Sequence, residues 1–122
     1  MPYTNHWEKD GLYRKFTGKI TGYEILESNF GLQVQPAFKA IKYIINDFTE
    51  VTGHAIEKEH TDIYAETDKR AAEKRASLKI AILVTQPEQI VLAEGYRAEM
   101  KDNQFICEIF QTMKDARDWA SN

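Results

Sequence analysis

The stretch LKIAILVT, residues 78–85, is the longest strand-favouring run in the chain and is apolar except for Lys79 and Thr85. A short run of this kind is typical of a strand that is buried on both faces. Such strands occur in sheets that are covered by helices on both sides. The stretch therefore predicts an interior strand of an α/β sheet.

Helix signals lie on both sides of this strand. Before it, Thr61 or Asp62 is positioned to cap a helix that ends near Ser77, and after it Pro87 fits the first turn of another helix. Residues 104–110 then predict a second strand, and a short last helix begins at Thr112. In that helix we expect Ala116 and Trp119 to face the sheet.

The N-terminal part predicts a hairpin. Asp10-Gly11 is a favoured type I′ turn pair, and residues 3–8 and 12–17 flank it. Because side chains alternate along a strand, one face of the second strand carries Leu12, Arg14 and Phe16, and the other carries Tyr13 and Lys15.

A helix and a further strand follow the hairpin. Thr21 and Glu24 have capping-box spacing, and the helix they begin is expected to bury Tyr23, Leu26 and Phe30 and to stop at Gly31. Residues 41–45 predict another buried strand, which ends at Asn46-Asp47. Residues 48–61 are expected to form a polar connection.

Together these elements have the order ββαβαβαβα in a single domain spanning 1–122. Strands that alternate with helices imply parallel pairing, while the initial hairpin adds one antiparallel strand. We therefore predict an α/β fold with three layers, in which four helices cover a mixed, mainly parallel five-stranded sheet.

Composition excludes several classes of protein. The 122 residues include 16 basic and 19 acidic side chains, so the net charge of −3 argues against a general nucleic-acid binder. Cys107 is the only cysteine, which rules out an internal disulfide and a multi-cysteine metal site. No secretory leader or membrane span is recognisable, and we expect a cytoplasmic protein.

Four segments in order carry a family resemblance: FTGKIT (16–21), IINDFT (44–49), KIAILV (79–84) and ARDW (116–119). Together they resemble the SpoIIAA-like branch of the STAS superfamily, in particular small bacterial proteins described as STAS/CRAL-TRIO-like. The resemblance covers almost the whole chain and implies the same fold.

This resemblance implies two functional themes. The first is binding of an apolar or lipid-like ligand and association with membrane surfaces. The second is partner switching by anti-sigma-factor antagonists, in which a Ser or Thr at the start of the second helix is phosphorylated. Thr61 stands at that position, although the Asp, Gly and Leu of the antagonist motif are missing around it.

We take a non-enzymatic binding or regulatory module as the leading hypothesis. The third helix carries more apolar residues than one core-facing stripe needs, so it is expected to line a pocket, form a homodimer interface or rest on a membrane. The residues expected to contact an apolar ligand are Tyr64, Ile90, Leu92 and Tyr96.

Basic residues on the second helix form the membrane part of this hypothesis. They are Lys69, Arg70, Lys74 and Arg75, and they would face anionic lipid headgroups. The alternative is a solvated outer face whose charges pair with neighbouring glutamates, because surface ion pairs are common and weak.

Enzymatic alternatives have less support. Five possible metal ligands lie close together in one connection, but their spacing matches no familiar zinc pattern: His54, Glu57, Glu59, His60 and Asp62. No phosphate loop, nucleophile elbow or HExxH motif is present. We therefore expect no catalytic residue, no metal and no cofactor, and keep hydrolysis at a loop metal site as the weakest alternative.

Overall fold

The computed structural model describes residues 3–55, 58–72, 77–101 and 104–121, and confirms the predicted order of strands and helices. A short 3₁₀ helix, η1, adds one element that was not predicted. The elements are β1 (Tyr3–Trp7), β2 (Gly11–Thr21), α1 (Gly22–Gln33), η1 (Pro36–Lys39), β3 (Tyr43–Ala55), α2 (Lys58–Ala72), β4 (Leu78–Leu83), α3 (Pro87–Glu99), β5 (Phe105–Phe110) and α4 (Met113–Ser121).

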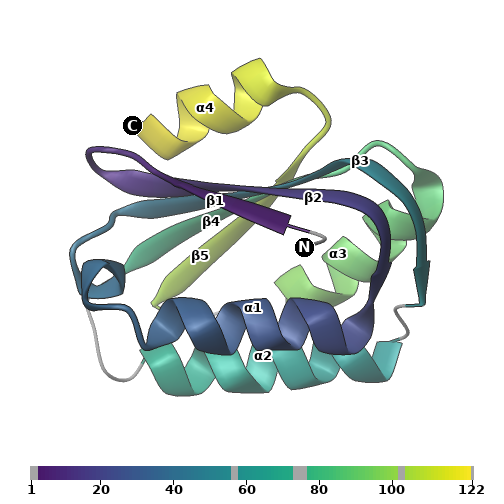
Figure 1. The fold of residues 1–122 in the computed structure, drawn as a ribbon, viewed down its shortest axis with the longest axis horizontal. Helices are drawn as coiled ribbons and strands as arrows, with labels where there is room; N and C mark the ends of the chain where they lie inside the picture. The colour runs from purple at the N-terminus through teal and green to yellow at the C-terminus, as the bar shows by residue number, and fades with distance from the viewer. Residues whose placement is uncertain (1–2, 56–57, 73–76, 102–103, 122) are drawn as a thin grey trace.

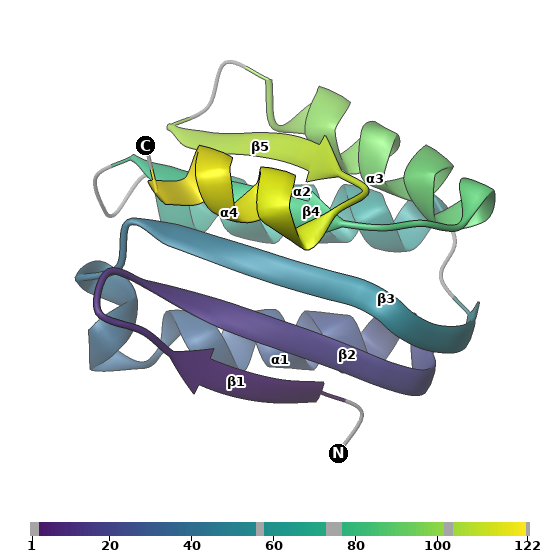
Figure 2. The same cartoon turned by 90° about the horizontal axis from the view of Figure 1, so that it is seen from above.

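The five strands lie side by side in chain order, β1-β2-β3-β4-β5, as Figure 2 shows. β1 is antiparallel to β2, and the remaining neighbours are parallel. Helices α1, α2 and α3 cover one face of the sheet and α4 covers the other (Figure 1). The predicted mixed sheet and three layers are therefore confirmed.

β4 contains the stretch from which the fold was predicted. It lies between β3 and β5, and every one of its residues except Lys79 is buried. The side chain of Lys79 is half-buried, and its Nζ donates a hydrogen bond to the carbonyl oxygen of Trp119 at 2.9 Å. Helices on both faces explain why the strand is apolar apart from Lys79.

The hairpin turn differs from its prediction. The amide of Glu8 donates to the carbonyl of Gly11 at 2.8 Å, so Lys9 and Asp10 are the central turn residues and Gly11 already belongs to β2. Among the described glycines only Gly18 has a positive φ. Gly11 serves a different purpose, because a Cβ there would overlap the ring of Tyr43.

Helix α1 begins as predicted but buries another face. The Thr21 hydroxyl accepts from the amide of Glu24 at 3.2 Å, and the Glu24 carboxylate accepts from the amide of Thr21 at 2.8 Å. Tyr23 and Phe30, which were expected in the core, are exposed, and Leu26 is only partly buried. The buried side chains are Ile25, Ser28, Asn29 and Leu32.

Three further boundaries were wrong. Helix α1 passes Gly31 and continues to Gln33. Strand β3 continues to Ala55 instead of ending at Asp47, because its second half pairs with residues 17–21 of β2 and buries Val51. Helix α2 consequently begins at Lys58, and Thr61 lies inside the helix instead of capping it.

The core has a part on each side of the sheet. The larger part, between the sheet and helices α1, α2 and α3, includes Phe16, Leu78 and Phe105. The smaller part joins α4 to Ile45 and Ala81 of the sheet. As predicted, α4 turns Ala116 and Trp119 toward the sheet.

Candidate functional site

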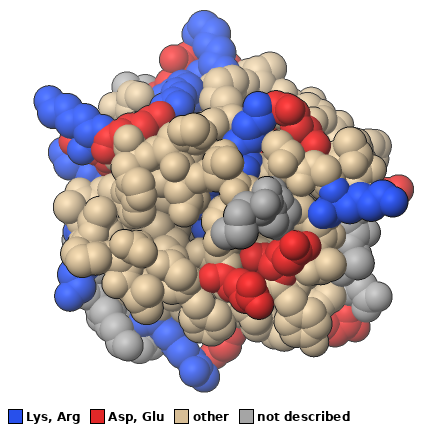
Figure 3. Space-filling view, in the orientation of Figure 1, with Lys and Arg blue, Asp and Glu red and all other residues tan. Residues whose placement is uncertain are grey.

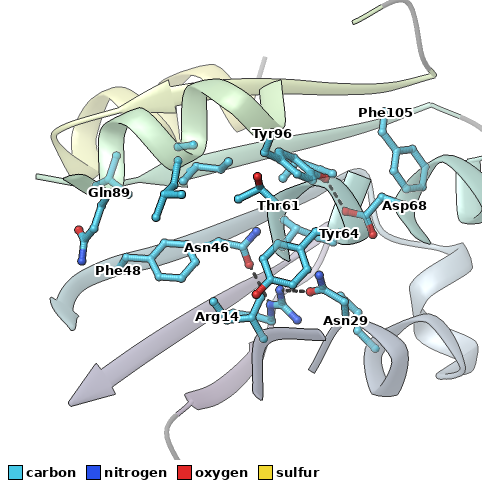
Figure 4. Close-up of a pocket in the computed structure, with 18 of the residues that line it drawn as sticks. Arg14, Asn29, Asn46, Phe48, Thr61, Tyr64, Asp68, Gln89, Tyr96 and Phe105 are labelled. Carbon is cyan, nitrogen blue, oxygen red and sulfur yellow. Dashed lines mark hydrogen bonds between the residues drawn. The ribbon is translucent and has the colours of Figure 1, made fainter. Parts of the chain in front are cut away.

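A cavity of about 110 Å³ lies in the larger part of the core, between the sheet and helices α1, α2 and α3 (Figure 4). Most of its wall is apolar. Side chains from β2, β3, β4, β5 and all three helices contribute, among them Ile20, Ile25, Leu32, Ile44, Phe48, Ile80, Ile82, Val84, Ala93 and Phe105. Gln33, Asn46, Phe48 and Leu92 are half-buried, so the wall reaches the surface at these residues.

Arg14 is the most unusual residue of the wall, because its side chain is charged and only 3% exposed. Its Nε donates to Asn46 Oδ1 at 2.9 Å and its Nη2 to Asn29 Oδ1 at 2.7 Å. Its Nη1 donates to Ser28 Oγ at 3.2 Å, and the guanidinium lies 5.3 Å from the centre of the Phe16 ring. Burial lowers the pKa of Arg14 to about 10, so the side chain remains charged at neutral pH.

Asp68 on α2 is the only acid among the described residues that line the cavity. Gln33 donates to its Oδ1 at 2.8 Å, and the Tyr96 hydroxyl donates to its Oδ2. Burial raises the pKa of Asp68 to about 6, although both hydrogen bonds and the charge of Arg14 favour the ionised form. A buried cation and a buried, titratable carboxyl therefore share one small apolar space.

The raised pKa of Asp68 predicts a specific dependence of stability on pH. Between its usual pKa of 3.8 and about 6, the folded protein holds a proton that the unfolded chain releases. The contribution of Asp68 to stability is therefore complete below pH 3.8 and is lost as pH rises through 6. Relative to Asp68→Asn, we expect the wild type to gain roughly 2 kcal/mol from about pH 7.5 to about pH 4.5.

Urea unfolding of both proteins at the two pH values measures this difference. The hydrogen bond to Arg117 lowers the pKa of Glu8, so the contribution of Glu8 to stability changes with pH in the opposite direction. This contribution is the same in both proteins and cancels in the comparison. A difference between the two proteins that does not change with pH would contradict the assignment.

Gln89, in the first turn of α3, is the third polar feature of the wall. Its side chain is 7% exposed, and its Oε1 accepts no hydrogen bond from any residue that the structure describes. Figure 4 shows the Gln89 amide on the same side of the cavity as Phe48, away from Asp68. A buried acceptor without a donor is costly, so this atom is suited to a donor that comes from outside the chain.

Comparison with known proteins shows the fold but no function. No protein-family model and no curated protein matches the sequence. The crystal structure of an uncharacterized protein from the DUF3478 family of Shewanella loihica PV-4, described as having a SpoIIAA-like fold, matches with a TM-score of 0.56. The two chains are 16% identical, and the match covers 97% of this chain and 91% of that one. The fold is SpoIIAA-like.

The SpoIIAA-like fold brings three of the four predicted ligand residues to the cavity. Tyr64, Leu92 and Tyr96 line it, whereas Ile90 is partly buried against the core outside the wall. The Tyr64 hydroxyl donates to the carbonyl of Gly22 at 2.6 Å, which holds α2 against the start of α1. Their role toward a ligand stays a prediction.

Sequence reasoning missed Arg14, Asp68 and Gln89 as site residues. A signal existed for Arg14, since its predicted position between Leu12 and Phe16 places it on the buried face of β2. No local pattern marks Asp68 or Gln89, because each faces the core only through the packing of its helix.

The predicted basic patch is only partly described. The Nζ of Lys69 forms an ion pair with Oε2 of Glu99 on α3 at 3.6 Å. Arg70 is exposed and lines a groove together with Phe30, Val34 and Lys39. Lys74 and Arg75 lie outside the described residues. On the face drawn in Figure 3, basic and acidic side chains are interspersed.

Thr61 and Cys107, which the sequence also singled out, are both buried. Thr61 is 5% exposed and lines the cavity from within α2. Burial raises the pKa of the Cys107 thiol to about 12. No group of three metal-ligating side chains and no helix long and apolar enough to cross a membrane occurs among the described residues.

Proposed function

We propose that this SpoIIAA-like domain is a non-enzymatic binding module that takes one small, mainly apolar molecule into the cavity below the sheet. The observation that carries the proposal is the cavity itself, about 110 Å³ in the core and lined chiefly by apolar side chains. Protein interiors are normally close-packed, so a void of this size costs stability unless it is filled.

The volume sets the size of the ligand. An engineered apolar cavity of about 150 Å³ admits benzene, whereas pockets for drug-sized ligands are roughly 300–1,000 Å³. The cavity here is therefore suited to a molecule of about benzene size or to a short carbon chain. A long-chain lipid would require α2 or α3 to move away from the sheet.

The ionisable groups of the wall favour binding over catalysis. Burial raises the pKa of Tyr64 and Tyr96 above the usual value, so neither hydroxyl becomes a nucleophile at neutral pH. Both oxygens of Asp68 already accept hydrogen bonds from Gln33 and Tyr96. These side chains are arranged to hold one another and the ligand in place.

The phosphorylation alternative fits this geometry poorly. A kinase needs an exposed hydroxyl. Thr61 is buried in the layer formed by α1, α2 and α3, and its side chain faces the cavity. Phosphorylation there would bring a dianion into an apolar space, which is unfavourable. A small neutral molecule can occupy the same space without rearrangement.

Filling the cavity tests the proposal. Ala93 lines the cavity from α3, so Ala93→Leu places three additional carbon atoms in that space. We expect the wild type to show saturable chemical-shift changes with benzene at cavity-lining residues and Ala93→Leu to show none. Ala98→Leu, the same change at an exposed position of α3, is the matched control and should bind benzene as the wild type does.

Circular dichroism should show that both variants are folded, since overpacking costs about 1–3 kcal/mol. Failure of the wild type to bind benzene or any other small probe would refute the proposed function. Equal binding by Ala93→Leu would place the binding site elsewhere.

A further inference from the structure

The Arg14 guanidinium has donors to spare inside the cavity. It carries five N–H groups, of which three donate to Asn46, Ser28 and Asn29. The other two, one on Nη1 and one on Nη2, donate to no residue that the structure describes. A buried charged donor without an acceptor is unfavourable, so these groups call for an acceptor from a ligand.

We propose that the ligand of this cavity is a small monocarboxylic acid that binds with its carboxylate at Arg14 and carries a hydroxyl or N–H group near its other end, at Gln89. This inference rests on the proposed function and names its ligand class. The two polar contacts come from different elements, β2 and α3, and both line the same space (Figure 4).

Charge favours a carboxylate over a phosphate. Arg14 brings one positive charge into the cavity, and a carboxylate matches both that charge and the planar geometry of the guanidinium. A phosphate dianion would bring one more negative charge than a carboxylate into an apolar space that already contains the Asp68 carboxyl. The oxygens of Asp68 accept from Gln33 and Tyr96, and Asp68 therefore leaves the two spare donors of Arg14 available.

Gln89 supplies the second part of the recognition. Its buried Oε1 lacks a donor, and a carboxylate offers none. A hydroxyl or N–H at the far end of the ligand satisfies this atom, while the apolar wall, which includes Phe48 and Ile82, contacts the carbon chain. The ligand class is thus a short acid with a terminal donor.

Three probes of similar length test the class in the wild-type protein: butanoate, its neutral amide butanamide, and 4-hydroxybutanoate. We expect butanoate to bind about tenfold more tightly than butanamide, because hydrogen bonds to an ionised acceptor are stronger. We expect 4-hydroxybutanoate to bind more tightly than butanoate. Isothermal titration calorimetry gives the affinities, and the ¹⁵N shift of the Arg14 Nε–H group, assigned by its absence in Arg14→Lys, reports any change in the environment of the guanidinium.

Gln89→Met retains the side-chain volume and removes the acceptor. In this variant we expect 4-hydroxybutanoate to lose its advantage, so that it and butanoate bind with equal affinity. Equal affinity of butanoate and butanamide, or an Arg14 Nε–H signal that does not respond, would overturn the carboxylate assignment. An advantage of 4-hydroxybutanoate that survives in Gln89→Met would overturn the role of Gln89. If benzene binds and no acid does, the ligand class is wrong and the proposed function stands; if nothing binds, both are wrong.

Discussion

Replacing Arg14 with alanine is expected to lower the free energy of unfolding by about 3–5 kcal/mol. The truncation leaves the oxygens of Ser28, Asn29 and Asn46 without their donor. It also removes the cation near the buried Asp68 and enlarges the cavity beside Phe16. Each of these changes is unfavourable in a low-dielectric core, and together they place this variant among the most destabilising in the chain.

Urea unfolding followed by circular dichroism measures the effect. Arg97→Ala is the control, because the Arg97 side chain is exposed and its pair with Glu108, at 3.1 Å, lies on the surface. A surface pair contributes roughly 0–1 kcal/mol, so the control should differ little from the wild type. Equal stability of the two variants would show that Arg14 is not energetically important.

Ile82→Ala is expected to cost about 2–5 kcal/mol. Ile82 lies on β4, is 7% exposed and forms part of the cavity wall. Its truncation removes buried contacts and joins the space it leaves to the existing cavity, where the surrounding strands cannot close around it. The variant should therefore be less stable and should accept a larger probe than the wild type.

Ile106→Ala provides a matched control on the neighbouring strand β5. Ile106 is 51% exposed, and its truncation should change stability by no more than about 0.5 kcal/mol. Thermal and urea unfolding give the stabilities, and titration with indole compared with benzene tests the enlarged cavity. A cost for Ile82→Ala no greater than that of the control would contradict its place in the core.

The sequence predicted the helices and strands better than it predicted the residues of the site. The apolar run 78–84, the capping box at Thr21 and the proline at the start of α3 are local signals, and each element that they mark is present. The hairpin turn lies one residue earlier than predicted, and β3 is longer than predicted. The second half of β3 is polar and becomes a strand through its pairing with β2, which no local pattern reports.

The buried face of α1 shows the same limit in one helix. Hydrophobicity favoured Tyr23 and Phe30, yet Ser28 and Asn29 face the core and Phe30 is 52% exposed. These two polar residues are buried because they accept hydrogen bonds from Arg14, which lies on another element. Apolar periodicity cannot identify a helix face whose partner is a buried charge.

The sequence by itself determined the α/β class, the order of the elements and the alternation that turns Arg14 inward, because periodicity and capping act between residues close in the chain. Only the tertiary structure decided that Arg14, Asp68 and Gln89 share one cavity. They come from β2, α2 and α3, and their desolvation, hydrogen bonds and pKa values depend on helix and sheet packing across large sequence separations. Burial is a property of the packed layers, so the chemistry of this site exists only once those layers have formed.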